Sequence, residues 1–335
     1  GVDDDFFAIG GDSIRSIQIV ARSRTRGVEV SPREVFEHRT VAALAEVAAA
    51  REGTGGPVVL AELDGGGVGW SPLSPVGRYL LELGGGYGRY QQSIVVDLPE
   101  GIDADSLAAT VAAVLDTHDV LRATLVLEDG GGLETGAPGS LRAQDLIHRV
   151  PCDGRWGEES WGRLLETEAD AAAGRLDPAA GVMAQFVWFD VSGAEGATGG
   201  GRLLIALHHL VVDGVSWRIL LPDFAAAWEQ IRVGRAPALP GVATSVRRWS
   251  HALVEEAARP SRAAELPLWK AVLDGPDPLL GSRPVDPAVD VMSTVDTVRV
   301  QLPAEVTEAV LTAVPAAFHG GVNDGLLAAL ALALA

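Results

Sequence analysis

The stretch Leu204–Leu221, LIALHHLVVDGVSWRILL, carries two adjacent histidines from an apolar run into a short acidic turn and then onto a second apolar segment. Its beginning belongs to the continuously apolar run Leu203–Leu207, which predicts a strand covered on both faces. Helical spacing of apolar residues resumes after the turn. The stretch therefore predicts a strand, a tight turn and a helix, with His208 and His209 at the end of the strand.

The two histidines are expected to differ in role. Neighbouring residues of a strand point to opposite faces, so both imidazoles cannot face one pocket, and one of them should be structural. Gly214 in the turn is expected to permit a backbone conformation or a close approach that a side chain would block. An imidazole beside this turn, near the free N–H groups of a helix start, can move a proton and stabilise an oxyanion.

The same residues also fit a different interpretation, in which the histidines form a buried pair in the core and Asp213 caps the following helix. A metal site is disfavoured, because no cysteine or carboxylate cluster accompanies His208 and His209 at ligand spacing. From the residues alone, a core pair and a proton-transfer site both stay open.

The segment HHLVVDGVSW, residues 208–217, resembles the His-His-x-x-x-Asp-Gly signature of the condensation and epimerisation domains of nonribosomal peptide synthetases, in the chloramphenicol-acetyltransferase-like superfamily. The resemblance implies that His209 acts on the substrate, whereas His208 and Asp213 are structural. It also implies an ion pair between Asp213 and Arg122, the arginine of a His-x-x-Leu-Arg motif. Without the motif, Arg122 would be interpreted as a solvated charge at a helix end. The implied fold is an α/β acetyltransferase-like lobe with a mixed, largely antiparallel sheet.

A second resemblance lies near the N-terminus. Apolar residues at helical spacing follow Ser13, which is therefore expected at a helix start, where free N–H groups and the helix dipole favour a phosphate. A capping-box pattern at Ser31 and apolar spacing after Thr40 predict two more helices, which makes a small all-α bundle. FFAIGGDSIRSIQIVARSR (6–24) and EVFEHRTVAALA (34–45) resemble a peptidyl carrier domain. The resemblance implies 4′-phosphopantetheine on Ser13, attached by a phosphopantetheinyl transferase.

The composition limits the class of protein. With 335 residues, of which 47% are hydrophobic, the chain can bury a large core. The formal net charge of −19 argues against nucleic acid as a partner, because its phosphates would be repelled. A single cysteine, Cys152, excludes an internal disulfide and fits a reducing cytoplasm. No apolar run reaches the length of a membrane span and no signal peptide opens the chain, so we expect a soluble cytoplasmic protein.

The expected organisation is a partial carrier domain over residues 1–50, without its first helix, a linker over 51–70, and an epimerisation- or condensation-type domain over 71–335. This last domain is expected to contain the first of two lobes and only the start of the second. We therefore expect a fragment of a larger synthetase that is inactive alone, with an upstream adenylation domain and other modules as its partners.

Local patterns predict the main elements of this domain. The strand Gln92–Leu98 lies where epimerisation domains have an Asn-Gln strand, with Gln91 in place of the Asn. The other expected elements are a helix capped by Asp105 or Ser106, a helix Glu158–Ala173, an antiparallel hairpin of Met183–Asp190 with Arg202–Leu210, a helix after Trp217 that Pro222 kinks or ends, and a strand Val295–Leu302.

The choice of reaction rests on the residues after the Asp-Gly pair. Val215-Ser216-Trp217 resembles epimerisation domains more than condensation domains, and the order of carrier then domain agrees. A thioester acidifies the Cα–H of a carried aminoacyl or peptidyl group, so a positioned base can remove that proton and an acid on the opposite face can return it. We assign His209 as one acid/base and the N–H groups near Gly214 as donors to the enolate. The family resemblance implies a glutamate of the second lobe as the other acid/base.

Two alternatives remain. The first is peptide-bond condensation, in which the same His209 assists the acceptor amine. The second is a non-catalytic lobe for docking carrier domains, in which the histidine motif only shapes the fold.

Overall fold

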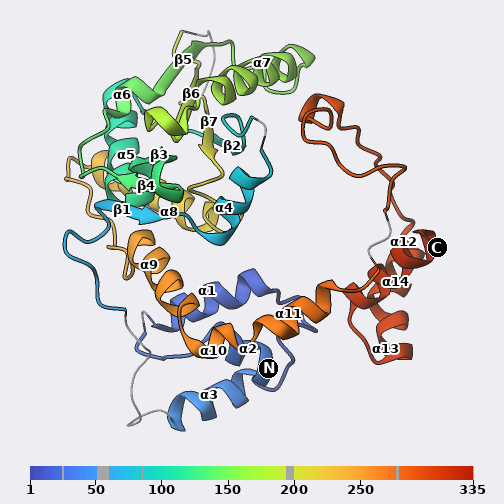
Figure 1. Ribbon diagram of the computed structural model, residues 1–335. Coiled ribbons are helices and arrows are strands. Elements are labelled where there is room, and N and C mark those ends of the chain that lie inside the picture. The colour runs from blue at the N-terminus through green and yellow to red at the C-terminus, as the bar shows by residue number, and fades with distance from the viewer. Residues whose placement is uncertain (25, 51–59, 85, 194–199, 277–278, 335) are drawn as a thin grey trace. The chain divides into compact units, whose positions relative to one another are not determined.

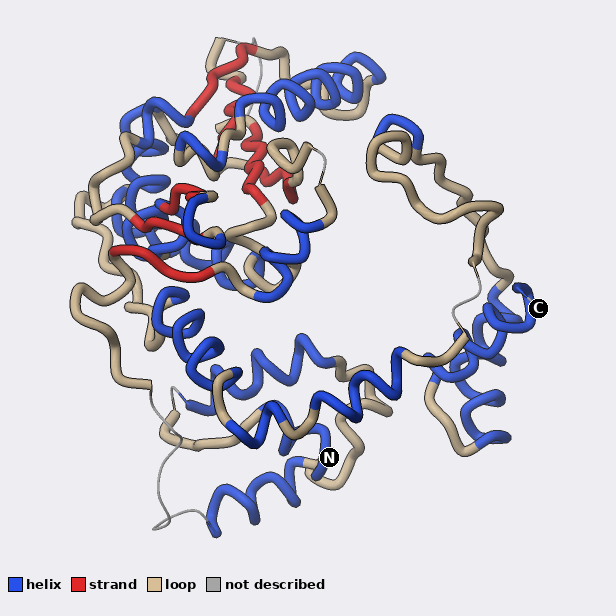
Figure 2. Tube along the Cα trace, in the orientation of Figure 1, coloured by secondary structure: helices blue, strands red, loops and turns tan. Residues whose placement is uncertain are grey.

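The computed structural model of the chain describes residues 1–24, 26–50, 60–84, 86–193, 200–276 and 279–334 (Figure 1). These residues form two compact units. The first unit consists of Gly1–Arg78 and Gly88–Glu256, and the second of Tyr79–Tyr87 and Ala257–Ala335. Among the described residues, strands occur only in the first unit, whereas the second is built from helices and loops (Figure 2).

The N-terminal helices are α1 (Ser13–Arg24), α2 (Pro32–His38) and α3 (Val41–Ala50), so the three helices predicted here are confirmed. The capping box of α2 also forms. The Glu34 N–H donates to the Ser31 hydroxyl at 3.3 Å, and the Ser31 N–H donates to the Glu34 carboxylate at 2.8 Å. Val35 is fully buried, and the rings of Phe7 and Phe36 lie 4.8 Å apart. These contacts give the bundle a small core.

A four-stranded sheet organises the rest of the first unit. Its order is β2-β7-β6-β5, with β2 at Gln91–Asp97, β7 at Arg202–His208, β6 at Ala184–Asp190 and β5 at Ile147–Pro151. β5 runs parallel to β6, and the other neighbours are antiparallel, so the predicted mixed, largely antiparallel sheet is confirmed. β6 and β7 form the predicted hairpin, and residues 194–199 of its tip lie outside the described residues.

Both faces of the two central strands are covered. On one face, buried side chains of β6 and β7 pack against α7 (Glu159–Arg175) in a cluster of Ala172, Val187, Phe189, Leu204 and Ala206. On the other face, Phe186 of β6 meets Phe224 of α8 (Trp217–Ile231) edge to face at 6.1 Å. Every residue from Leu203 to His208 is buried, as the apolar run predicts. Each buried Leu or Ile contributes about 1.5–3 kcal/mol to stability.

α5 (Ala104–Thr117) contacts α8 on this second face. Asp103 caps α5, not Asp105 or Ser106 as predicted. The Ser106 N–H donates to the Asp103 carboxylate at 2.8 Å, and the Asp103 N–H donates to the Ser106 hydroxyl at 3.0 Å. At the other end of α5, His118 Nε2 lies 2.7 Å from the Asp223 carboxylate of α8. This pair ties the two helices together.

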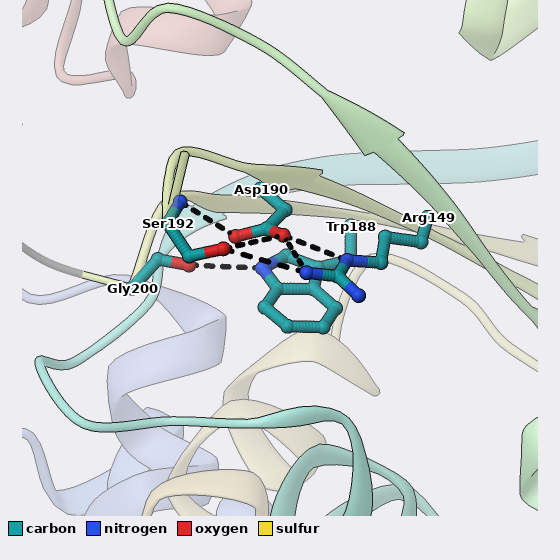
Figure 3. A network of polar contacts seen from close by, with 5 residues as sticks. All are labelled: Arg149, Trp188, Asp190, Ser192 and Gly200. Carbon is teal, nitrogen blue, oxygen red and sulfur yellow. Dashed lines mark hydrogen bonds and ion pairs between the residues drawn. The ribbon is translucent and has the colours of Figure 1, made fainter. Parts of the chain in front are cut away.

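The network in Figure 3 closes the outer edge of the sheet. Arg149 of β5 donates from Nε to Asp190 of β6 at 2.7 Å, and its guanidinium lies 4.9 Å from the centre of the Trp188 ring. The Ser192 hydroxyl donates to the same carboxylate at 3.0 Å, and the Trp188 indole donates to Gly200 O at 2.9 Å. Although burial opposes ionisation, the hydrogen bonds from Ser192 and Arg149 hold the pKa of Asp190 below its ordinary value.

A second, smaller sheet has the order β1-β4-β3, with β1 at Gly69–Pro72, β4 at Gly132–Thr135 and β3 at Ala123–Val126. Gly69 and Trp70 pair with Thr135 and Glu134, so the linker predicted over 51–70 overlaps β1 at its end. Residues 51–59 of that linker lie outside the described residues. Further helices are α4 (Pro75–Glu82), α6 (Ala143–Leu146) and α9 (Val246–Ala257).

Pro222 lies inside α8, and the helix continues to Ile231, so the prediction that this proline ends the helix is wrong. A proline in a helix removes one backbone hydrogen bond. Burial of Leu220, Ala227 and Trp228 on one face of α8 offsets that loss.

The second unit contains α10 (Pro260–Ala263), α11 (Leu266–Leu273), α12 (Ala304–Glu308), α13 (Val314–Phe318) and α14 (Val322–Leu334), with a π-helical turn at Ala309–Ala313. The strand predicted over Val295–Leu302 does not form. Its alternating valines stay exposed, and Val298 has 87% of its surface accessible. Because a strand is stabilised by a partner strand, an alternating segment without one stays extended but unpaired.

Among the described residues, no single helix is long and apolar enough to cross a membrane. The bent pair Ala304–Phe318 and Val322–Leu334, which meet at 97°, passes the same test of length and composition only when taken together.

Candidate active site

His209 follows the last residue of β7 and is held on three sides. Its backbone N–H donates to Tyr90 O at 2.9 Å, which extends the β2–β7 pairing by one step. Its ring stacks on the Tyr90 ring with centres 4.8 Å apart and planes 15° apart. Its Nδ1 lies 2.7 Å from Val212 O. The side chain is half-buried, so the ring is fixed yet remains partly accessible.

The other ring nitrogen of His209 meets two residues that the sequence did not single out for the site. His209 Nε2 lies 3.1 Å from Nε2 of Gln92 in β2. The Trp217 indole N–H, at the start of α8, donates to Oε1 of the same Gln92 at 2.9 Å. In the sheet, Gln92 pairs with Leu207, two residues before His209. The pairing register is the signal that would have brought Gln92 into the site.

His208 has the structural environment that was predicted for one of the two histidines. It is fully buried at the end of β7, and its N–H donates to Met183 O at 2.8 Å. Its Nδ1 accepts from the Leu210 N–H at 3.2 Å. The structure therefore separates a buried His208 from a half-buried His209, as strand alternation requires.

Asp213 shapes the turn between β7 and α8. Its Oδ1 accepts from the N–H groups of Val215 and Ser216 and from the Ser216 hydroxyl, each at 2.9 Å. Burial opposes ionisation, but the hydrogen bonds from Ser216 and Val215 outweigh it and hold the pKa of Asp213 below its ordinary value of 3.8. Asp213 is thus a cap-like turn residue, as the core-pair interpretation also held.

The ion pair predicted between Asp213 and Arg122 is wrong. Arg122 is 4% exposed, and its guanidinium donates to Leu115 O, to Asp116 O at 2.9 Å and to Gly136 O at 3.1 Å. Burial lowers the pKa of Arg122 from its ordinary value. The guanidinium covers the C-terminal carbonyls of α5, where a cation is favoured by the helix dipole. Arg122 is neither a solvated charge nor a partner of the histidine motif.

Gly214 does not need to be glycine for the reason predicted. Its φ angle lies outside the left-handed region, and a Cβ added there would meet no atom within 4 Å. The N–H groups of Val215 and Ser216 already donate to Asp213. Two of the donors expected to stabilise an enolate near Gly214 are therefore engaged within the turn itself.

Acid is expected to weaken this turn. Because the pKa of Asp213 is lower in the folded state, its ionised form stabilises the fold above the ordinary value of 3.8, and this contribution is lost as the pH falls through the lower folded-state value. The difference in unfolding midpoint between the wild type and Asp213→Asn, followed by urea denaturation from pH 7 to pH 2.5, is expected to shrink on the acid side. A difference that does not change with pH would contradict this.

Two family models match this chain. Residues 1–48 match the model of the phosphopantetheine attachment site, and residues 185–335 match that of the condensation domain. The chain belongs to the nonribosomal peptide synthetases. A linear gramicidin synthase of Brevibacillus parabrevis is 34% identical over all of this chain, and surfactin synthase subunit 1 of Bacillus subtilis is 30% identical over all of it. The chain spans 6% and 9% of the lengths of these two relatives.

The fold of this synthetase chain is similar to a solved epimerisation domain, that of the third module of tyrocidine synthetase B, with a TM-score of 0.64 and 26% identity. The similarity covers 80% of this chain and 60% of the other. The acetyltransferase-like fold predicted from the histidine motif is thereby confirmed. In the described part of the chain, no group of three or more His, Cys, Asp or Glu side chains could hold a metal ion.

The matched attachment-site model implies a covalent phosphopantetheine, and the start of α1 fits such a group. A Cβ on Gly11 would lie 2.4 Å from Phe6 O, so only glycine fits in the turn before the helix. The Asp12 carboxylate accepts from the Arg15 N–H at 2.7 Å, which caps α1 and makes Ser13 its first residue. The N-terminus of a twelve-residue helix favours a phosphodiester at this point.

Replacing Ser13 with alanine is expected to abolish attachment of phosphopantetheine. Intact-mass measurement after incubation with coenzyme A and a phosphopantetheinyl transferase reports the modification directly. Ser23→Ala, a serine substitution in the same helix, is the matched control and is expected to be modified as the wild type is. Undiminished modification of the Ser13 variant would refute the assignment.

Proposed function

We propose that this chain is part of a synthetase that epimerises a carrier-tethered aminoacyl or peptidyl thioester at Cα, from L to D, by acid–base catalysis. Residues 1–50 act as the carrier and 71–335 as the epimerisation-type domain. Phosphopantetheine supplies a thiol on a flexible arm, which carries the substrate as a thioester. The observation that carries the proposal is the anchored, half-buried ring of His209, with Nδ1 fixed to Val212 O and Nε2 turned away from it.

His209 acts on the acidified Cα–H. Nε2 takes the proton, the Cα–H electron pair moves into the enolate of the thioester, and a second acid returns a proton to the opposite face of Cα. As the family resemblance implies, that acid is a glutamate of the second lobe. Asp213 and His208 hold the end of β7 and the following turn, which fixes the direction of the His209 ring.

Two observations support epimerisation over other reactions of the superfamily. The Val215-Ser216-Trp217 segment resembles epimerisation domains, and Trp217 contacts the site through Gln92. The solved domain with a TM-score of 0.64 is an epimerisation domain. Condensation is the second candidate, favoured by the condensation model that matches residues 185–335. In that reaction His209 would assist the attacking amine.

The carrier and condensation models imply thioester-bound substrates and other synthetase modules as partners. The proposed partners extend this to an upstream adenylation domain, which loads the carrier, and to a phosphopantetheinyl transferase. Nucleic acid is not proposed as a partner, because a net charge of −19 would repel phosphates.

A single incubation separates the three outcomes. The synthetase module that contains this chain is loaded at Ser13 with an L-aminoacyl thioester and mixed with a downstream carrier bearing a second amino acid. After the thioesters are cleaved, chiral chromatography and mass spectrometry identify the products. A D-residue formed in the absence of acceptor supports epimerisation. A new amide without inversion indicates condensation, and unchanged L-residue on both carriers indicates a docking lobe.

A further inference from the structure

Three side chains join α8 to the candidate base. The Trp217 indole donates to Gln92 Oε1 at 2.9 Å, and Gln92 Nε2 lies 3.1 Å from His209 Nε2. The residues are far apart in sequence, since Gln92 lies 117 positions before His209 and 125 before Trp217. The β2–β7 pairing and the start of α8 bring them together.

The chemistry of these groups fixes the hydrogens. An indole N–H can only donate, so the atom of Gln92 that faces Trp217 is the amide oxygen. The amide nitrogen therefore faces His209, and an NH₂ group can only donate. It follows that His209 Nε2 accepts and carries a lone pair.

The opposite side of the ring gives the same answer independently. Val212 O is a carbonyl oxygen and can only accept, so the hydrogen between it and the ring, at 2.7 Å, belongs to His209 Nδ1. Donors and acceptors on both sides of the imidazole thus match a single neutral tautomer. The tautomer of a histidine is set by the partners of its two nitrogens.

We propose that Gln92 and Trp217 are positioning residues that hold His209 in the Nδ1–H tautomer, so that the ring approaches the substrate with its lone pair on Nε2. This inference rests on the proposed function. It gives Trp217 a physical task in the chemistry of the site, beyond its value as a sequence marker of epimerisation. It also predicts that the Gln92 amide must leave Nε2 as the Cα–H arrives, since both compete for the same lone pair.

The neighbouring elements leave this assignment intact. Tyr90 contacts the His209 ring through its face, where it competes for neither ring nitrogen. Asp213, the charged group nearest in the turn, directs its Oδ1 to Val215 and Ser216. Gln92 is therefore the described side chain that faces Nε2.

Two substitutions test the inference, and ¹⁵N NMR of histidine-labelled protein is the readout. Trp217→Phe keeps an aromatic ring but removes the N–H, so the Gln92 amide can rotate and both neutral tautomers should become populated. Gln92→Glu places a carboxylate between Trp217 and the ring, so His209 should carry a hydrogen on Nε2 as well as on Nδ1. Of the seven histidines, His209 is assigned by the signals that vanish in His209→Ala.

Trp188→Phe is the matched control. It removes an indole hydrogen bond, to Gly200 O at 2.9 Å, from a buried tryptophan outside this set of contacts (Figure 3). It should leave the His209 signals unchanged. In the wild type, Nδ1 should show the shift of a protonated ring nitrogen and Nε2 that of an unprotonated one.

Activity provides a second, separate measurement. In the loaded module, Trp217→Phe is expected to reduce the rate of Cα exchange about tenfold, and Gln92→Glu about a hundredfold, because the lone pair is lost for part or nearly all of the time. A hydrogen on Nε2 in the wild type would overturn the inference, as would a Trp217→Phe variant with unaltered His209 shifts. If the shifts behave as expected but no Cα exchange occurs in the wild type, the proposed function fails while the assignment of the tautomer stands.

Discussion

Replacing His209 with alanine is expected to lower the rate of Cα epimerisation by about a thousandfold. A positioned acid/base side chain typically contributes about 10²–10⁴-fold, and alanine has no group that can accept the Cα proton. The ring is half-buried and lies beyond the last residue of β7, so its loss should leave the sheet intact. The rate is measured as appearance of the D-residue on the carrier, by chiral chromatography after cleavage of the thioester.

His251→Ala is the matched control for this substitution. His251 lies in α9 and packs edge to face against Trp70, with ring centres 5.8 Å apart, outside the contacts of His209. It should retain the wild-type rate. A His209 variant that remains folded and keeps more than a tenth of the activity would exclude His209 as the acid/base.

Replacing Arg122 with alanine is expected to lower the free energy of unfolding by about 3 kcal/mol. The substitution removes hydrogen bonds to three carbonyl oxygens and leaves a space at a nearly fully buried position. Urea denaturation measures the change. Arg142→Ala is the matched control, because Arg142 is 81% exposed and pairs only with Asp145 in the next turn. Exposed pairs of this kind contribute about 0–1 kcal/mol.

A double-mutant cycle decides between the two roles considered for Arg122. If Arg122 stabilises the end of α5, the effects of Arg122→Ala and Asp213→Ala on unfolding should add to within about 0.5 kcal/mol. An ion pair between them would instead give a coupling energy well above that. Additivity would confirm that the two motifs are structurally separate.

Much of the fold around the motif could be predicted from local sequence. The continuous apolar run before His208 specifies a strand buried on both faces, and strand alternation requires the two histidines to have different surroundings. Both expectations are confirmed, because they depend only on consecutive residues. The same holds for the three N-terminal helices, whose caps and apolar spacing lie within a few residues of each other.

The parts that were missed depend on tertiary contacts. The partners of Arg122 are backbone carbonyls of α5 and of Gly136, which no side-chain pattern reveals. Gln92 reaches His209 only because of the register between β2 and β7, across 117 positions. Val295–Leu302 has the alternation of a strand, but alternation does not supply a partner. Local pattern thus predicted the elements, and the register and packing between them decided the contacts of the site.

The central claim is that His209 moves the Cα proton of a thioester held on Ser13, and loss of a Cα label tests it most directly. The loaded module carries a Cα-deuterated aminoacyl group and is followed in a single turnover by mass spectrometry. We predict that the wild type releases deuterium to water while the thioester stays intact, and that His209→Ala retains the label over the same period. Retention of deuterium by the wild type, with an intact thioester, would contradict the account.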